Sequence, residues 1–356
     1  MSSLADENCL LNGDNSIQTR EDWDAYCAHR SPPRPELLTR EAYAGLDEEA
    51  CENHDLARDA WHGDFGLGST PVMTEALERF RLVARLNANS NDPIKAHLAL
   101  TGPPTQGKTT IIRHLGRDFE RRLRQRLKKQ GIGLTRNAAV CPVVHYSLDS
   151  ESTTRSLNTG ILHYLGVLLS DTRAYNNAQL SQAAAETLKR HRVQLLILDD
   201  VHLLKRGHSN TEEIRDYLKA LTSKAPIMLL LAGIDLDKTD LFEETRDKTG
   251  VKAGQTGGRT GLIKVTRFVK GSKAWKGLIA WIEAQLVLMD HQPGSLVNMQ
   301  AYLWNRSQGS IGSLMTLLRL AALSVTGQAC ERIDKKVLDK IEIDHNAEKH
   351  GNRGEA

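Results

Sequence analysis

The chain has 356 residues, of which 40% are hydrophobic and 26% are charged, and its formal net charge is +3 at pH 7. This length allows one large domain or two ordinary ones, and the apolar content is enough for a buried core. The small net charge excludes a uniformly basic or acidic protein, so a polyanion could be bound only by a local cluster of cations.

No segment is typical of a membrane-spanning or secreted protein. The apolar run at residues 227–232 is far too short to cross a bilayer. The opening residues MSSLADENC carry neither a basic cluster nor an apolar stretch, so we expect no secretory signal and a cytoplasmic protein. The five cysteines are scattered, odd in number and without C-x-x-C spacing, which indicates reduced thiols and argues against a zinc site.

Composition and apolar periodicity divide the chain into four regions. We expect a polar N-terminal arm at 1–75 that is partly helical and partly flexible, an α/β core at 76–270, a helical lid at 271–344 and a disordered tail at 345–356. Strands that alternate with helices, followed by helices alone, predict an α/β fold with a parallel sheet and a small helical lid. The elements expected in chain order are helices at 36–62 and 76–88, a strand at 98–100, a long basic helix from Thr109 to about Gln130, a strand at 138–148, helices at 161–169 and 183–192, a strand at 195–198, a helix at 211–222, a strand at 227–232, a mobile loop at 245–261, a strand at 262–268, and lid helices at 274–289, 295–307 and 310–325.

Residues 102–109, GPPTQGKT, fit the pattern G-x-x-x-x-G-K-T between a predicted strand and a predicted helix. The glycines of this pattern let the backbone wrap around an anion, with its N–H groups pointing at phosphates. Lys108 reaches the β- and γ-phosphates, and the Thr109 hydroxyl is placed to hold Mg²⁺. The sequence therefore predicts a P-loop that binds ATP and Mg²⁺, because a chance glycine–proline turn would have to match both pattern and context. The predicted nucleotide-binding residues are Gly102, Pro103, Pro104, Thr105, Gln106, Gly107, Lys108, Thr109 and Thr110.

A second motif, LLILDD at 195–200, supports the first. Its four apolar residues suit a parallel strand buried on both faces, and its carboxylates follow the end of the strand at which open α/β sheets bind ligands. We expect Asp199 to hold Mg²⁺, directly or through water, and Asp200 to orient or deprotonate an attacking water. An apolar strand ending in acids is common by chance, but its place about ninety residues after the P-loop suits an intervening βαβ unit.

Four segments resemble the TnsC/TniB family of AAA+ ATPases, which regulate DNA transposition. They are GPPTQGKTT at 102–110, LLILDDVHLL at 195–204, LLLAGID at 229–235 and QGSIGSLMTLLRLAAL at 308–323. The last segment, with its Gly-x-Ile-Gly-x-Leu helix start, is the most specific to this branch. The resemblance implies an AAA+ core with a lid, slow ATP hydrolysis activated by assembly, and a homo-oligomeric ring or filament. It also implies duplex DNA, an integrase-type transposase and a target-selection protein as partners.

The resemblance further implies an arginine that completes the neighbouring subunit's site, usually just before the fifth strand. Arg259 is the candidate, with Arg246 and Arg267 as alternatives and a solvated loop arginine as the simpler interpretation. Many relatives have Glu where this chain has Asp200, and the shorter side chain would slow hydrolysis or require a water bridge.

The family also places sensor residues near the nucleotide. After the fourth strand Ile234 stands where a polar sensor is expected, which leaves Asp235 as the candidate. In the lid, Gly312 stands where many relatives have a sensor arginine, and Arg319, two turns later, is expected to be a surface or partner-binding residue.

Two segments are candidates for DNA contact. The helix at 117–130 is rich in Lys and Arg, but its four-spaced apolar stripe favours an ordinary solvated amphipathic helix. At the loop-to-helix start that follows the second strand, Thr153, Thr154 and Arg155 suit phosphate contacts, although Asp149 and Glu151 oppose them. The resemblance implies that this face lines the central channel of the assembly, where binding would be independent of base sequence and sensitive to salt.

Two functional classes stay open on the sequence. The first is an ATP-dependent regulator of transposition that binds target DNA and recruits a transposase. The second is a signalling or defence NTPase that switches conformation and binds only protein partners. A small-molecule kinase is disfavoured because the helical lid offers no obvious acceptor site.

Overall fold

A five-stranded parallel sheet forms the centre of one of the two units into which the chain folds. The computed structural model describes residues 17–131, 140–149, 152–168, 174–201, 208–238 and 259–343. Among these residues, the sheet unit comprises 17–28 and those between Val72 and Val265, and the helical unit comprises His29–Pro71 and 266–343. The predicted α/β fold, with a parallel sheet followed by C-terminal helices, is confirmed.

The strand order in the sheet is β2-β3-β4-β1-β5, and every neighbouring pair is parallel. Three central strands are buried along their whole length, which is why their sequences are continuous apolar runs rather than alternating patterns. The strands are β1 (His97–Thr101), β2 (Val143–Ser147), β3 (Leu195–Asp199), β4 (Met228–Gly233) and β5 (Thr260–Lys264).

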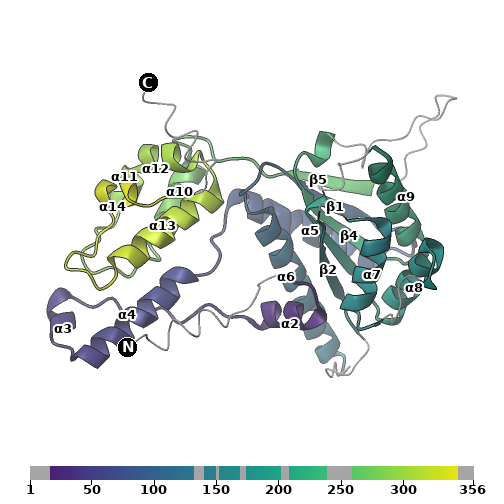
Figure 1. Cartoon of the computed structure of the whole chain (residues 1–356), viewed down its shortest axis with the longest axis horizontal. Helices are drawn as coiled ribbons and strands as arrows, with labels where there is room; N and C mark the ends of the chain where they lie inside the picture. The colour runs from purple at the N-terminus through teal and green to yellow at the C-terminus, as the bar shows by residue number, and fades with distance from the viewer. Residues whose placement is uncertain are drawn as a thin grey trace. The chain divides into compact units, whose positions relative to one another are not determined.

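Helices cover both faces of this sheet (Figure 1). Helices α5 and α6 lie on one side, and α7, α8 and α9 pack together on the other. Capping boxes begin two of them, at Thr153 for α7 and at Asn176 for α8. The helices of this unit are α2 (Arg20–Ala28), α5 (Pro71–Asn89), α6 (Lys108–Lys129), α7 (Thr154–Tyr164), α8 (Asn177–Arg190) and α9 (His208–Lys224), with a short 3₁₀ turn at Leu236–Lys238.

The helical unit joins two distant parts of the sequence. Helix α4 lies beside α13, and the ring of Trp61 packs in the same apolar core as Leu314 and Leu318 (Figure 1). The indole N–H of Trp61 also donates to the carbonyl of Gln285 at 2.7 Å. The helices are α3 (Arg40–Ala44), α4 (Glu48–Gly63), α10 (Lys273–Glu283), α11 (Ser295–Asn298), α12 (Gln300–Ser307), α13 (Ile311–Val325) and α14 (Lys335–Asp339).

The segment expected to form one N-terminal arm is divided between the two units. Helix α2 belongs to the sheet unit, where Trp23 is 1% exposed and its indole N–H donates to Glu120 at 2.6 Å. Residues 29–71 belong to the helical unit. The expected mobile loop at 245–261 lies largely outside the described residues, and the expected tail lies wholly outside them.

Several predicted boundaries move for local reasons. The strand expected at 138–148 begins only at Val143, directly after Pro142, which has no N–H to donate to a sheet. The helix expected at 295–307 is two short helices that meet at Met299. Within the described chain, no helix is long and apolar enough to span a bilayer.

Candidate nucleotide-binding site

The P-loop follows β1 and leads directly into α6, as the motif predicts. Gly102 lies so close to the end of β5 that a Cβ there would be 2.0 Å from the carbonyl oxygen of Val265. Gly107 has φ of 77° and stands at the N-cap of α6, where no side chain caps the helix. The first N–H groups of α6 are therefore not used by a side-chain cap and are oriented to bind an anion.

Lys108 is folded back over its own loop. Its Nζ donates to the carbonyl oxygens of Gly102, at 2.9 Å, and Pro103, at 2.6 Å. Burial lowers the pKa of this ammonium, while the carboxylates of Asp199 and Asp200 act in the opposite direction. A cation held in a half-desolvated loop next to two carboxylates is suited to transfer its hydrogen bonds to phosphate oxygens.

The Thr109 hydroxyl, at the start of α6, and the Asp199 carboxylate, at the end of β3, contact each other. They form a side-chain hydrogen bond, and Asp199 is 2% exposed. Burial raises the pKa of Asp199, while hydrogen bonds from Thr109 and from the backbone N–H of Asp200 lower it. A hydroxyl and a carboxylate in contact are hard oxygen ligands, which fit Mg²⁺ shared with phosphates. No group of three or more His, Cys, Asp and Glu that could hold a metal occurs among the described residues.

Asp200 adopts a backbone conformation that is uncommon for a side-chain-bearing residue. Its φ is 55°, and its N–H donates to Oδ1 of Asp199 at 2.9 Å. Asp and Asn tolerate this left-handed region better than most residues. The turn places the partly exposed Asp200 next to the candidate metal ligand, as expected for a residue that acts on water.

A polar network at the same end of the sheet was not predicted from the sequence. The hydroxyl of Thr101 accepts from the N–H of Leu236 at 2.8 Å and donates to Asp237 at 3.4 Å. Asp237 also pairs with Lys264, whose Nζ is 2.8 Å from its Oδ2. The hydrogen bond from Lys264 lowers the pKa of Asp237. Asp235, the polar residue that the sequence suggests after β4, has φ of 51°. The sequence carries one charged residue at the end of β5 and another after β4, but their pairing depends on the strand order, in which β1 lies between these two strands.

Arg259 immediately precedes β5, so it lies at the end of the sheet where the strands begin. Its own P-loop lies at the other end, where β1 finishes. β5 runs parallel to β1, with Thr260 opposite His97 and Lys264 opposite Thr101. At about 3.3 Å per residue, the five residues from Arg259 to Lys264 separate Arg259 from the end of the sheet that carries the P-loop by roughly 17 Å. Its Nη1 is 3.6 Å from Oδ2 of Asp92, and the side chain is 38% exposed.

The two alternatives to Arg259 fall elsewhere. Arg246 lies outside the described residues, and Arg267 belongs to the helical unit, where its Nη1 donates to the carbonyl of Gln308 at 3.4 Å. Arg319, expected at the surface, instead packs its guanidinium 4.9 Å from the ring centroid of Phe65, and burial lowers its pKa.

The three DNA-contact candidates meet at the start of α7, but their side chains differ in availability. Thr153 is exposed and accepts from the N–H of Ser156 as the N-cap of the helix. Thr154 is only 4% exposed, so its hydroxyl offers little surface to a ligand. Arg155 donates to the carbonyl of Tyr175 at 3.0 Å, which ties it to the segment before α8.

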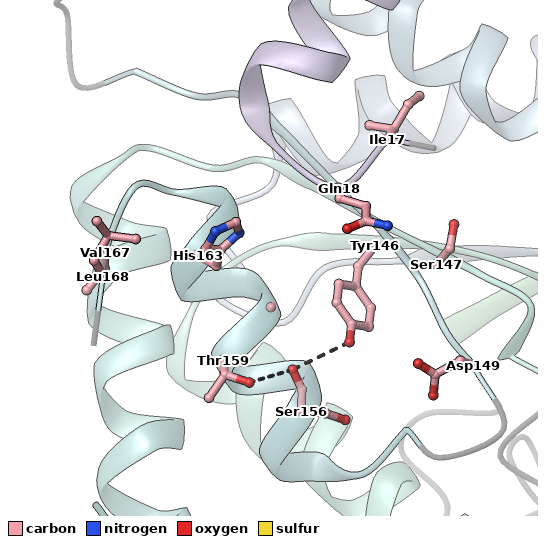
Figure 2. Close-up of a pocket in the computed structure, with 11 residues that line it drawn as sticks. Ile17, Gln18, Tyr146, Ser147, Asp149, Ser156, Thr159, His163, Val167 and Leu168 are labelled. Atoms are coloured by element: carbon pink, nitrogen blue, oxygen red, sulfur yellow. Dashed lines mark hydrogen bonds between the residues drawn. The ribbon is translucent and has the colours of Figure 1, made fainter. Parts of the chain in front are cut away.

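A cavity of about 490 Å³ lies between the end of β2 and α7, next to these candidates (Figure 2). Tyr146 and Asp149 line it from the β2 side, and Ser156, Thr159 and His163 line it from α7. No residue of the P-loop contributes to it. Its lining comes from separate segments, including Ile17 and Gln18, and for that reason no sequence motif indicates it.

Comparison with solved structures supports the fold of this site. A complex of the Aeropyrum pernix ORC1 protein with DNA has a TM-score of 0.55 and 16% identity, over 81% of this chain and 68% of that one. The ADPNP–ADP complexes of the Aeropyrum pernix ORC2 protein give 0.52 and 14%, over 75% and 66%. The Drosophila ORC bound to DNA gives 0.51 and 14%, over 89% and 70%. At these identities the likeness shows the AAA+ fold alone.

The sequence itself shows the family. No curated protein matches the chain. The model of the family described as bacterial TniB protein, however, matches residues 58–245, which include both the P-loop and the Asp199–Asp200 pair. Because that match spans more than half of the chain, the protein belongs to the TniB family of AAA+ P-loop ATPases.

Proposed function

We propose that this protein is an ATP-dependent regulator of DNA transposition that binds target DNA as a homo-oligomer and recruits or stimulates an integrase-type transposase in the cytoplasm. The observation that carries the nucleotide part is the contact between Thr109 and buried Asp199, next to Lys108 in an open P-loop. Membership of the TniB family carries the transposition part.

In this proposal each residue of the site has one task. The N–H groups of the P-loop bind the phosphates, and Lys108 moves from its own carbonyls to the β- and γ-phosphates. Thr109 and Asp199 would hold Mg²⁺, which would supply positive charge to the phosphate oxygens. Asp200 orients the attacking water and accepts its proton. Arg259 completes the site of a neighbouring subunit, because it is far from its own P-loop.

DNA binding is proposed through phosphate contacts of the exposed start of α7, with Thr153 and Arg155 as ligands. Such contacts fix the position of a duplex but carry no base information. One subunit offers few of them, so we expect binding to require the ATP-driven assembly of several subunits. A target-selection protein is a further partner that the family resemblance suggests.

The test is fluorescence anisotropy with two unrelated duplexes over a salt series, with a slowly hydrolysed ATP analogue and with ADP. We expect ATP-dependent binding with little sequence preference and a steep loss of affinity with salt. Arg155→Ala should weaken both duplexes about equally. Nucleotide-independent binding, or no binding at low salt, would favour the alternative function, a signalling or defence switch that acts only on protein partners.

A further inference from the structure

Four cations follow one another at three-residue spacing along the helical unit. They are Arg267, Lys270, Lys273 and Lys276, here called the basic strip, and all four are exposed. The first two lie in the segment before α10, and the last two lie on α10, where three-residue spacing places them on the same face. No described carboxylate forms an ion pair with any of them.

Hydrogen bonds to α12 and to the turn that follows it fix the backbone of the strip. The N–H of Phe268 donates to the carbonyl of Gly309 at 2.9 Å, and the indole N–H of Trp304 donates to the carbonyl of Phe268 at 2.8 Å. A Cβ on Gly309 would be 2.4 Å from that same carbonyl oxygen, so the two segments are as close as glycine permits. The backbone between the cations is therefore anchored, even though their side chains are exposed.

Two of the cations are also oriented individually. Lys270 lies 5.4 Å from the centroid of the Trp304 indole ring and donates to Oδ1 of Asn305 at 2.8 Å. Arg267 uses one N–H on the carbonyl of Gln308. An ammonium has three donors and a guanidinium has five, so both retain donors for a ligand.

No carboxylate lies next to the strip in the sequence. The sequence has no Asp or Glu from residue 259 to 282, nor from 291 to 330. Glu283, the next carboxylate, is 9% exposed and accepts from the N–H of Leu296 and from Ser295. By contrast, the exposed lysines around α14 have carboxylates close to them in the sequence. The lysines are Lys335, Lys336 and Lys340, and the carboxylates are Asp334, Asp339 and Glu342. The strip is therefore a run of exposed cations without interspersed carboxylates, a pattern that favours a polyanionic ligand.

We propose that the basic strip is a second phosphate-binding surface for duplex DNA, separate from the start of α7. This inference rests on the proposed function and extends it to the helical unit. Lysine ammonium groups are point charges on flexible stems, which suit phosphates better than they suit selective recognition of side chains. The strip supplies affinity and salt dependence without base readout.

The experiment compares two triple variants of the full-length protein on two unrelated duplexes. Lys270→Gln, Lys273→Gln and Lys276→Gln together remove three charges from the strip. Lys335→Gln, Lys336→Gln and Lys340→Gln remove the same charge from the same unit, where carboxylates are interspersed. We measure anisotropy over a salt series with ATP analogue, together with ATP hydrolysis and thermal unfolding.

If the strip binds phosphates, its triple variant loses at least about tenfold in affinity on both duplexes, and its salt slope falls by about 2 to 3. The α14 variant stays within about twofold of the unmodified protein, and both variants unfold normally. Equal losses in the two variants would mean a general charge effect and overturn the proposal. So would a strip variant that binds DNA normally but no longer assembles with nucleotide, because the strip would then contact protein.

The proposed function and this inference fail in different ways. If the unmodified protein binds neither duplex at low salt, the proposed function is wrong and the strip loses its ligand. If the unmodified protein binds both and the strip variant binds equally well with the same salt slope, only the strip assignment is wrong.

Discussion

Arg58 of α4 and Glu331, 273 positions later in the chain, form an ion pair in which both side chains are 0% exposed. The guanidinium donates to both carboxylate oxygens, with Nη2 2.9 Å from Oε1, and it also pairs with Asp55. The N–H groups of Met289 and Gly327 donate to the same carboxylate. Breaking a fully desolvated pair of this kind is costly, because the remaining charge is left buried without its partner.

Arg58→Met should therefore destabilise the helical unit by about 3–5 kcal/mol, because it leaves a buried carboxylate without its cation. Adding Glu331→Gln should recover part of that loss, since the amide carries no charge and its oxygen still accepts from one of the two backbone N–H groups. The measurement is denaturant unfolding of the single and double variants. A double variant less stable than Arg58→Met would show that the charge is not the cause.

Lys108→Ala should weaken ATP binding by roughly 10- to 100-fold, the value of hydrogen bonds to a charged group. The lysine is only 8% exposed and contacts its own loop, so the fold of the variant is checked by circular dichroism. Isothermal titration with ATP and Mg²⁺ gives the affinity, and Lys128→Ala, at the far end of the same helix, is the control. Unchanged affinity would exclude Lys108 from phosphate binding.

Asp200→Asn should leave ATP binding within about twofold and lower turnover by roughly 10²-fold or more, the usual contribution of general base catalysis. Asn tolerates the positive φ of this position as Asp does, so the backbone turn is preserved. Binding and steady-state hydrolysis are measured separately. Normal turnover in this variant would remove Asp200 from the catalytic role.

Arg259→Ala should bind ATP normally and hydrolyse it about 10³-fold more slowly, as expected for the loss of an arginine finger. Mixing it with Lys108→Ala should restore part of the activity, because each subunit then supplies what the other lacks at one kind of interface. The assay is hydrolysis across mixing ratios, with oligomer formation followed in parallel. Intact oligomers without rescue would point to Arg246 or Arg267 instead.

The stability of the sheet unit should fall as the pH drops from about 6.5 towards 4. Burial lowers the pKa of His97 to about 4, and its Nδ1 accepts from the N–H of Leu229 at 3.1 Å, so the folded state holds the neutral ring. The stabilisation is complete above the unfolded pKa of 6.5 and is lost below it, by up to about 3 kcal/mol. Hydrogen exchange in β1 and β4 should show this pH dependence, and His97→Gln should reduce it. If the pH dependence of stability is the same in His97→Gln as in the unmodified protein, the loss of stability comes instead from buried His145, whose pKa is lowered to about 3.

The features that could be predicted from the sequence are those formed by residues that follow one another in the chain. The P-loop and β3 could be recognised because a glycine pair, a lysine and an apolar run define them within ten residues or fewer. The expected arm could not be placed correctly, because nothing near Trp23 or Arg58 indicates which distant segment buries each of them. The network of Thr101, Asp237 and Lys264 was missed for the same reason, since it depends on the strand order and not on spacing.

The pairing of Arg58 with Glu331 also has a consequence for how the protein is made. The partner of α4 lies 273 residues downstream, so at 5–20 residues per second a ribosome needs roughly 14 to 55 s to synthesise it. During that time the part of the sheet unit from Val72 to Val265 is produced, while Arg58 lacks Glu331 and the apolar face of α4 lacks α13. Nascent chains stalled before residue 331 should therefore be the species most prone to aggregation and most dependent on chaperones, even where the sheet unit has already folded.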